Sequence, residues 1–249
     1  MLKAFAAGRV FGASSGTGSP WVLALHGWRR SHRDFDAVLD GVAAIAVDLP
    51  GFGATPEPPE PWSTLQYAEW IAPIVDELAP GAVLVGHSFG GRVAAHLAAQ
   101  QPERIGALVL TGVPLVANPA RLPTRPPLAF RAGRALHRKG VIGDRRMESL
   151  RQRYGSADYR AADGVMRGVL VQAVNETYEV PLAAYPGPVE LVWGQDDREV
   201  PVAVAEAAAT IGRQAVLTLC PSAGHLVPTS APDCLRAAIL RHRPEQAAG

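Results

Sequence analysis

Residues Ala82–Gln100 read AVLVGHSFGGRVAAHLAAQ, and this stretch decides the fold. Ala82–Val85 is an apolar run with the length of a buried strand, and the alanine-rich Arg92–Gln100 predicts a helix. Between them, GHSFG fits the pattern G-x-S-x-G, in which a serine sits on a sharp turn from strand to helix. Ser88 is therefore predicted to be a nucleophile at the N-terminal end of a helix, where the helix dipole favours developing negative charge.

Similar apolar runs recur along the chain and alternate with segments of helical spacing. They lack the in/out alternation of a half-exposed sheet, as expected for parallel strands that are covered on both faces. The other predicted strands are Val22–Leu25, Ile45–Val47, Leu108–Leu110, Val189–Val192 and Val216–Leu219, and the other predicted helices are Leu65–Leu78, Val202–Ile211 and Cys234–Arg241. This alternation predicts an α/β fold with a doubly wound, mostly parallel sheet.

One long segment interrupts the alternation of strands and helices. Residues 114–186 lie between two predicted strands, begin with a proline-rich stretch and continue as short polar helices with few apolar residues. We expect this segment to form an inserted helical lid. The core domain would then comprise residues 1–113 and 187–249.

A serine hydroxyl is a poor nucleophile until a base takes its proton and a third group orients that base. Two later segments, each following a predicted strand, offer these groups. Residues 193–201 (WGQDDREVP) contain three acidic side chains, and residues 223–225 (AGH) end in His225. Serine, acid and histidine in this chain order suit a nucleophile on a strand-to-helix turn. The candidate acids are Asp196, Asp197 and Glu199.

Together these motifs resemble the α/β-hydrolase family, in particular its lid-bearing serine hydrolases, which include esterases and C–C bond hydrolases. Besides GHSFGG, the resemblance rests on Leu25–Trp28 (LHGW), on Asp48–Gly53 (DLPGFG) and on the acid and histidine segments. It covers nearly the whole chain outside the lid. The fold implied is a sheet of the α/β-hydrolase type with an inserted helical lid.

The same resemblance implies roles for individual residues. The triad acid would be Asp197, the fourth residue of a G-x-x-D turn, with Asp196 and Glu199 as fallback choices. The backbone N–H groups of Trp28 and Phe89 would form the oxyanion hole. A serine at position 88 argues against dehalogenase and epoxide hydrolase chemistry, which in this family uses an aspartate at this place.

The activity implied is hydrolysis of a carboxylic ester through an acyl-enzyme, with no cofactor and no metal. Two alternatives stay open. One is C–C bond hydrolysis of a vinylogous diketone-type compound, although in that group a tryptophan commonly follows the histidine and this chain has Leu226 there. The other is a receptor-like protein that keeps the fold for ligand binding. Turnover of a generic ester would distinguish an esterase from a receptor.

Charge is unevenly distributed along the chain. The formal net charge is +1, which gives no overall electrostatic argument for binding nucleic acid. Residues 114–168, however, carry twelve Arg or Lys against four acids, a net charge of +8. This pattern fits either a solvated arginine-rich surface or a lid that steers an anionic substrate. Arg29 and Arg30, beside the predicted oxyanion loop, are candidate substrate-binding residues.

The basic lid and the HGW sequence are also similar to those of carrier-protein methyl esterases. This similarity implies a small acyl ester that is itself anionic or is carried on an acidic carrier protein.

Composition limits the remaining possibilities. At 249 residues with 48% apolar side chains, the chain can build one large domain. Cys220 and Cys234 form no CxxC pair and have no metal-ligand spacing, so we expect free buried thiols in a reducing compartment. The N-terminal residues lack the apolar core of a secretion signal, and no apolar run approaches about 18 residues. We therefore expect a cytoplasmic protein without a membrane span.

Overall fold

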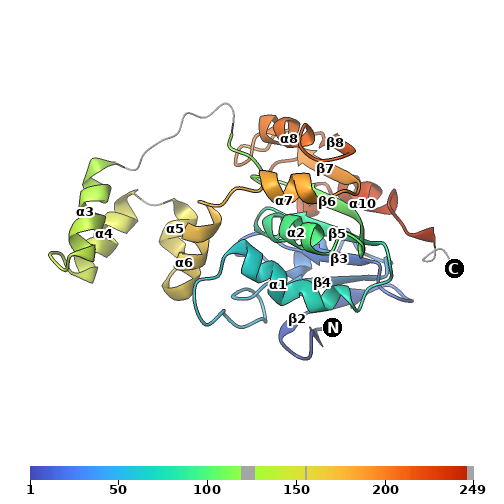
Figure 1. Cartoon of the computed structure of the whole chain (residues 1–249), viewed down its shortest axis with the longest axis horizontal. Coiled ribbons are helices and arrows are strands. Elements are labelled where there is room, and N and C mark those ends of the chain that lie inside the picture. Colours follow the sequence, from blue (N-terminus) through green and yellow to red (C-terminus); the bar gives the residue numbers. More distant parts are fainter. Residues whose placement is uncertain (119–126, 155, 246–249) are drawn as a thin grey trace.

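The computed structural model describes residues 1–118, 127–154 and 156–245. One sheet has the strand order β1-β2-β4-β3-β5-β6-β7-β8 (Figure 1). Its strands are β1 (Lys3–Phe5), β2 (Val10–Ser15), β3 (Val22–Leu25), β4 (Ala44–Asp48), β5 (Ala82–His87), β6 (Ile105–Thr111), β7 (Val189–Gly194) and β8 (Ala215–Cys220). The pairs from β4 through β8 are all parallel, which confirms the predicted mostly parallel sheet.

The antiparallel pair β1 and β2 at one edge of the sheet was not predicted. β2 pairs antiparallel with both β1 and β4. Its side chains are only partly buried along most of its length, in contrast to the fully buried β3, β4 and β5. The continuous apolar run that identifies a central strand is therefore missing from this edge.

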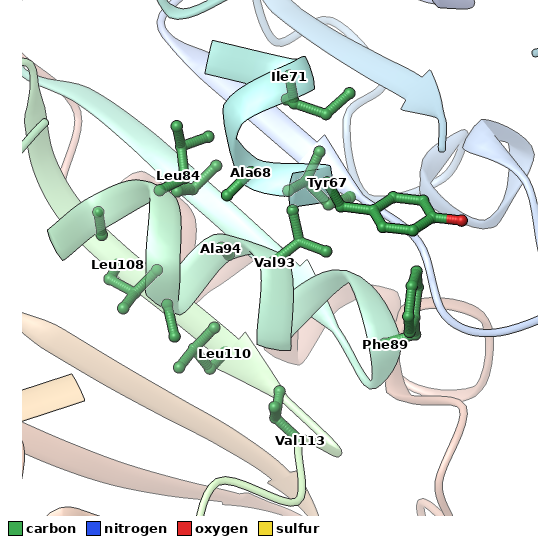
Figure 2. Packing of buried hydrophobic residues seen from close by; sticks show 14 of the residues in the cluster. Tyr67, Ala68, Ile71, Leu84, Phe89, Val93, Ala94, Leu108, Leu110 and Val113 are labelled. Atoms are coloured by element: carbon green, nitrogen blue, oxygen red, sulfur yellow. The ribbon is translucent and has the colours of Figure 1, made fainter. Parts of the chain in front are cut away.

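Helices cover both faces of the sheet. One face packs against α1 (Thr64–Val75), α2 (Phe89–Gln100) and α8 (Val202–Ala209), and the other packs against the 3-10 helix η1 (His32–Phe35) and α10 (Pro232–Leu240). Figure 2 shows Tyr67 and Ile71 of α1, Val93 of α2 and Leu84 of β5 within one cluster of buried apolar side chains. These contacts fix the position of α2, which begins directly after Ser88.

Helix α1 begins one residue before the predicted range and ends three residues before its predicted end. Its start is stabilised by a capping box, in which Ser63 accepts a hydrogen bond from the Gln66 amide and the Gln66 side chain accepts one from the Ser63 amide.

The segment between β6 and β7 is helical, as predicted. Its described helices are α3 (Leu128–Arg138), α4 (Asp144–Tyr154), α5 (Ala157–Ala161), α6 (Gly164–Ala173) and α7 (Glu179–Ala184). In Figure 1, α3 and α4 lie beside each other and away from the sheet, whereas α6 and α7 lie against the core. Buried side chains of α6 and α7, among them Val169 and Leu182, belong to the same hydrophobic cluster as α1 and α2. We call residues 127–186 the insertion.

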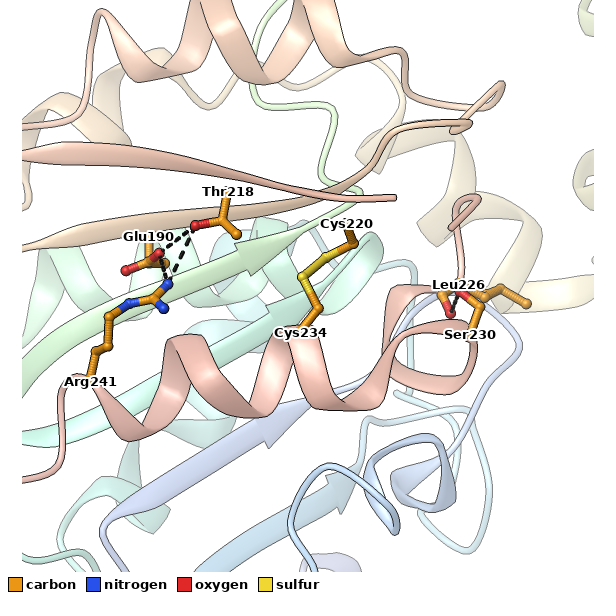
Figure 3. Close-up of a disulfide and its surroundings, with 7 residues drawn as sticks. All are labelled: Glu190, Thr218, Cys220, Leu226, Ser230, Cys234 and Arg241. Atoms are coloured by element: carbon orange, nitrogen blue, oxygen red, sulfur yellow. Dashed lines mark hydrogen bonds and ion pairs between the residues drawn. A yellow bond between two sulfur atoms is a disulfide. The ribbon is translucent and has the colours of Figure 1, made fainter. Parts of the chain in front are cut away.

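The expectation of two free thiols is wrong. Cys220, at the end of β8, and Cys234, in α10, form a disulfide with a Cα–Cα distance of 6.1 Å (Figure 3). Both segments belong to one wall of the fold, because α10 packs on the face of the sheet that carries the buried Cys220 side chain. The short helix α9 (Val227–Ser230) lies within the 14-residue loop that the disulfide closes, and so does His225.

Candidate active site

Ser88 occupies a strained turn between β5 and α2. Its backbone angles are φ 48° and ψ −110°, a conformation that residues with a Cβ rarely adopt. The turn is held by hydrogen bonds from the Ser88 amide to the Thr111 carbonyl (2.9 Å) and from the Gly90 amide to the His26 carbonyl (3.0 Å). A Cβ at Gly90 would lie 2.2 Å from the Leu25 carbonyl oxygen, so only glycine allows this approach. Strain at a site so firmly held is typical of a functional residue.

His225 is oriented by Asp197. The His225 Nδ1–H donates to Asp197 Oδ2 across 2.8 Å, which leaves Nε2 as the basic nitrogen. The other carboxylate oxygen of Asp197 accepts hydrogen bonds from the amides of Glu199 and Val200, both at 2.9 Å. Asp197 is buried, whereas Asp196 is exposed, so the structure brings only one of these two adjacent acids to the imidazole.

Glu199 approaches the opposite nitrogen of the same ring. Its Oε2 lies 3.8 Å from His225 Nε2, and its side chain is 73% exposed. Burial lowers the pKa of His225, but the hydrogen bond and charge of Asp197, together with the charges of Glu199 and Asp158, outweigh burial and leave that pKa above its ordinary value. His225 thus lies in a distinctly negative environment.

His87 connects the turn of Ser88 to the loop of His225. Its Nε2–H donates to the His225 carbonyl oxygen across 3.1 Å, and the two imidazole rings are 5.1 Å apart. The side chain is buried, and Nδ1 has no hydrogen-bond partner within the described chain. Burial, and next the neighbouring His225, lower the pKa of His87 to about 3, so the ring is neutral at physiological pH.

The loop after β3 is held by His26 and Asp48. His26 donates from Nδ1 to the Gly27 carbonyl (2.7 Å) and accepts at Nε2 from the Leu49 amide (3.0 Å). Asp48 accepts at Oδ1 from the backbone amide and Nδ1 of His32, both at 2.8 Å. His26 thus has a structural role, because its two hydrogen bonds join the end of β3 to the end of β4.

The side chains of the two residues predicted to form the oxyanion hole pack against each other. The rings of Trp28 and Phe89 are 5.3 Å apart, and both pack edge-on against Phe52. Tyr67 of α1 also packs against Phe89 at 5.1 Å (Figure 2). The backbone N–H groups of Trp28 and Phe89 donate to no acceptor among the described residues, which leaves both available to a substrate.

A cavity of about 230 Å³ brings the candidate residues together. Ser88, His225, Trp28 and Phe89 all line it, and the insertion contributes part of its wall. The remaining lining residues are Arg92, Pro114, Asp158, Leu170, Ala173, Val174, Glu199 and Val200. Ser88 at the strained turn and the Asp197-oriented His225 thus share one cavity. Sequence reasoning missed Arg92 and Asp158, since neither belongs to a motif.

Arg29 and Arg30 do not line this cavity. Arg30 forms a two-pronged hydrogen bond with Asp34, with both N···O distances 2.7 Å. The guanidinium is therefore occupied within its own loop. The basic residues of the insertion that the structure describes are likewise absent from the cavity wall, and Arg121 and Arg125 lie outside the described residues. The structure gives no support to substrate binding by Arg29 or Arg30.

Comparison with known proteins places the chain in a family. A family model described as the alpha/beta hydrolase family matches residues 22–235. An esterase of Mycobacterium tuberculosis is 40% identical over 111 residues, which span 43% of this chain and 37% of that protein. A 2-hydroxy-6-oxononadienedioate/2-hydroxy-6-oxononatrienedioate hydrolase of Burkholderia vietnamiensis is 30% identical over 228 residues, 79% of this chain and 77% of that protein.

A solved structure shares the same architecture. A serine hydrolase involved in carbazole degradation matches with a TM-score of 0.69 at 21% identity, covering 97% of this chain and 98% of that chain. The chain belongs to the alpha/beta hydrolase family and is a hydrolase. Within the described residues, no helix has the length and hydropathy needed to cross a membrane.

Proposed function

We propose that this protein hydrolyses a small carboxylic ester through an acyl-enzyme, with Ser88 as nucleophile, His225 as general base and Asp197 as its orienting acid. The observation that carries the proposal is the state of His225. Its Nδ1 is committed to the buried Asp197, while the ring shares one cavity with Ser88. A histidine held in this tautomer has Nε2 free to accept a proton.

The reaction proceeds in two halves. Ser88 Oγ attacks the ester carbonyl carbon as His225 Nε2 takes the hydroxyl proton, and the tetrahedral oxyanion accepts hydrogen bonds from the Trp28 and Phe89 amides. Each such donor contributes on the order of 3 kcal/mol to lowering the barrier. The intermediate collapses, and the departing alkoxide takes the proton from His225. Water then attacks the acyl-enzyme, His225 accepts its proton, and Ser88 regains it as the acid leaves.

The direct test is turnover of p-nitrophenyl esters from acetyl to decanoyl by the wild type and by Ser88→Ala. We expect the variant to lose roughly three to six orders of magnitude in kcat while it folds normally. Wild-type protein that hydrolyses none of these esters, and that a fluorophosphonate probe does not label at Ser88, would contradict the proposal and favour a receptor-like role.

C–C bond hydrolysis is a second candidate, favoured by the relative from Burkholderia vietnamiensis over 228 aligned residues. The same triad would serve it, so the residues at the bond-breaking centre do not separate the two activities. The name of that relative denotes a dioate, a compound with two carboxylates. Labelling of Ser88 by the probe without ester turnover would favour this candidate.

Residues 114–186 are proposed to act as a lid on a core formed by residues 1–113 and 187–249. The support is that Asp158, Leu170 and Ala173 of the insertion line the cavity. An acidic carrier protein would have to dock on the outer surface of this lid, because the described arginines of the insertion do not reach the cavity.

A cytoplasmic location stays a proposal, and the redox state of the two cysteines bears on it. The disulfide between Cys220 and Cys234 counts against a strongly reducing compartment, where thiols are kept reduced.

A further inference from the structure

The cavity next to Ser88 has an excess of negative charge. Glu199 contributes a carboxylate from the loop after β7, and Asp158 contributes one from α5 of the insertion. Glu199 Oε2 lies 3.8 Å from His225 Nε2, the atom that must face the substrate. The charges of both acids also raise the pKa of His225, so they act on the reacting centre.

Among the described residues that line the cavity, Arg92 is the one cation. Its guanidinium contacts other parts of the protein. It donates from Nη1 to the Ala173 carbonyl, at the end of α6. Its guanidinium also lies 5.4 Å from the Tyr178 ring centroid. Two carboxylates therefore face the cavity against one guanidinium that already binds the backbone of the insertion.

We propose that Glu199 and Asp158 make this site selective for esters that carry a positive charge, and that they discriminate against anionic esters. The inference rests on the proposed ester hydrolysis and names its substrate class. The cavity has a volume of about 230 Å³, so a charge on an acyl chain bound in it lies within the Debye length of about 10 Å at 0.1 M salt from both carboxylates. Salt ions therefore screen its interaction with these carboxylates only in part. A substrate carboxylate would meet two like charges, whereas an ammonium group would meet two opposite ones.

This selectivity for cationic esters is opposite to the preference for anions that the positive charge of residues 114–168 suggests. The +8 charge of residues 114–168 belongs to the segment as a whole, but among its described residues Asp158 is the one charged side chain that lines the cavity. Net charge of a segment attracts ligands from a distance, while the groups that line a cavity decide which charge is tolerated inside. The same acids oppose a dioate substrate.

Three p-nitrophenyl esters of equal chain length test the proposal. Their acyl groups are 4-(trimethylammonio)butanoyl, 5,5-dimethylhexanoyl and 4-sulfobutanoyl, with charges of +1, 0 and −1 that do not titrate. We expect wild-type kcat/KM to be at least tenfold higher for the cationic ester than for the anionic one, which corresponds to about 1.4 kcal/mol. Added salt at 0.5 M should reduce this ratio.

Substitutions test whether Glu199 and Asp158 cause the selectivity for cationic esters. Glu199→Gln combined with Asp158→Asn should bring the cation-to-anion ratio within about threefold, whereas Glu206→Gln, which removes an exposed charge of α8 outside the cavity, should leave it unchanged. The ratio cancels any common effect of Glu199 on His225. Because both substitutions are at exposed positions, a folding defect is not expected.

The outcomes are distinct for the two proposals. Ser88-dependent turnover of the neutral ester, with cationic and anionic esters hydrolysed equally or with the anion preferred, would overturn the charge selectivity and leave ester hydrolysis standing. A ratio that survives the double substitution would overturn the role of Glu199 and Asp158. Absence of both turnover and probe labelling would instead overturn ester hydrolysis itself, and the selectivity with it.

Discussion

His87 Nε2 donates a hydrogen bond to the His225 carbonyl oxygen across 3.1 Å, so the residue before the nucleophile holds the backbone of the proposed base. The other side of the same ring faces Gly27, where an added Cβ would lie 2.7 Å from His87 Nδ1. One buried imidazole therefore contacts both the loop of His225 and the loop that precedes Trp28. These two loops carry the proposed base and an oxyanion donor.

Replacing His87 tests this positioning role. We expect His87→Ala to lower kcat about 10- to 100-fold with little change in KM, because the His225 loop loses its donor and a small cavity opens beneath it. His87→Gln, whose amide can donate to the same carbonyl, should recover part of the loss. Equal kcat losses in both variants, or a loss confined to KM, would contradict the role. The measurement is steady-state kinetics on one neutral ester.

Gly112 should be essential for the placement of His225. It has φ +60°, and a Cβ there would lie 2.9 Å from His225 Cε1 and 3.0 Å from its Nδ1. Gly112→Ala should therefore displace the imidazole and lower kcat by at least tenfold. Gly81→Ala is the matched control, since Gly81 has φ +74° and a Cβ there would meet no atom within 4 Å. It should cost about 1 kcal/mol of stability and leave kcat unchanged. Similar kcat values for the two variants would refute the steric argument.

The pH dependence of kcat/KM should report His225. The neutral imidazole is the active base, so activity is lost as pH falls through its pKa. Asp197, with Glu199 and Asp158, raises the pKa of His225 above the ordinary value of a histidine despite burial, and the midpoint should therefore lie above that of an ordinary histidine. His87, with a pKa of about 3, should add no second step near neutrality. Glu199→Gln should move the midpoint of the pH profile to lower pH. An unchanged midpoint would exclude an effect of Glu199 on the pKa of His225.

The disulfide should stabilise the wall that carries His225. Cys220→Ser together with Cys234→Ser frees a loop of 14-residue separation, for which the chain-entropy model gives about 3 kcal/mol. We expect this loss in the free energy of unfolding from urea titration. Reductant should lower wild-type stability toward that of the double variant and should not affect the variant. If neither the double substitution nor the reductant changes the urea midpoint of unfolding, the two thiols are unpaired in solution.

Local patterns allowed much of the fold and part of the site to be predicted. The six strands from β3 to β8 follow from short apolar runs, and the Ser88 turn follows from glycine spacing, because each of these patterns depends on neighbouring residues. The antiparallel strands β1 and β2 were not predicted, since their residues form no apolar run of this kind.

The fold class and the chain order of Ser88, the acids and His225 could be predicted from the sequence alone. The tertiary structure was needed to show that Asp197 contacts His225 Nδ1 while Glu199 lies on the Nε2 side, that Cys220 pairs with Cys234, and that Asp158 lines the cavity. The physical reason is that these contacts join loops and helices distant in the chain. Side-chain direction in a loop depends on its path over the core, and no periodic pattern encodes that path.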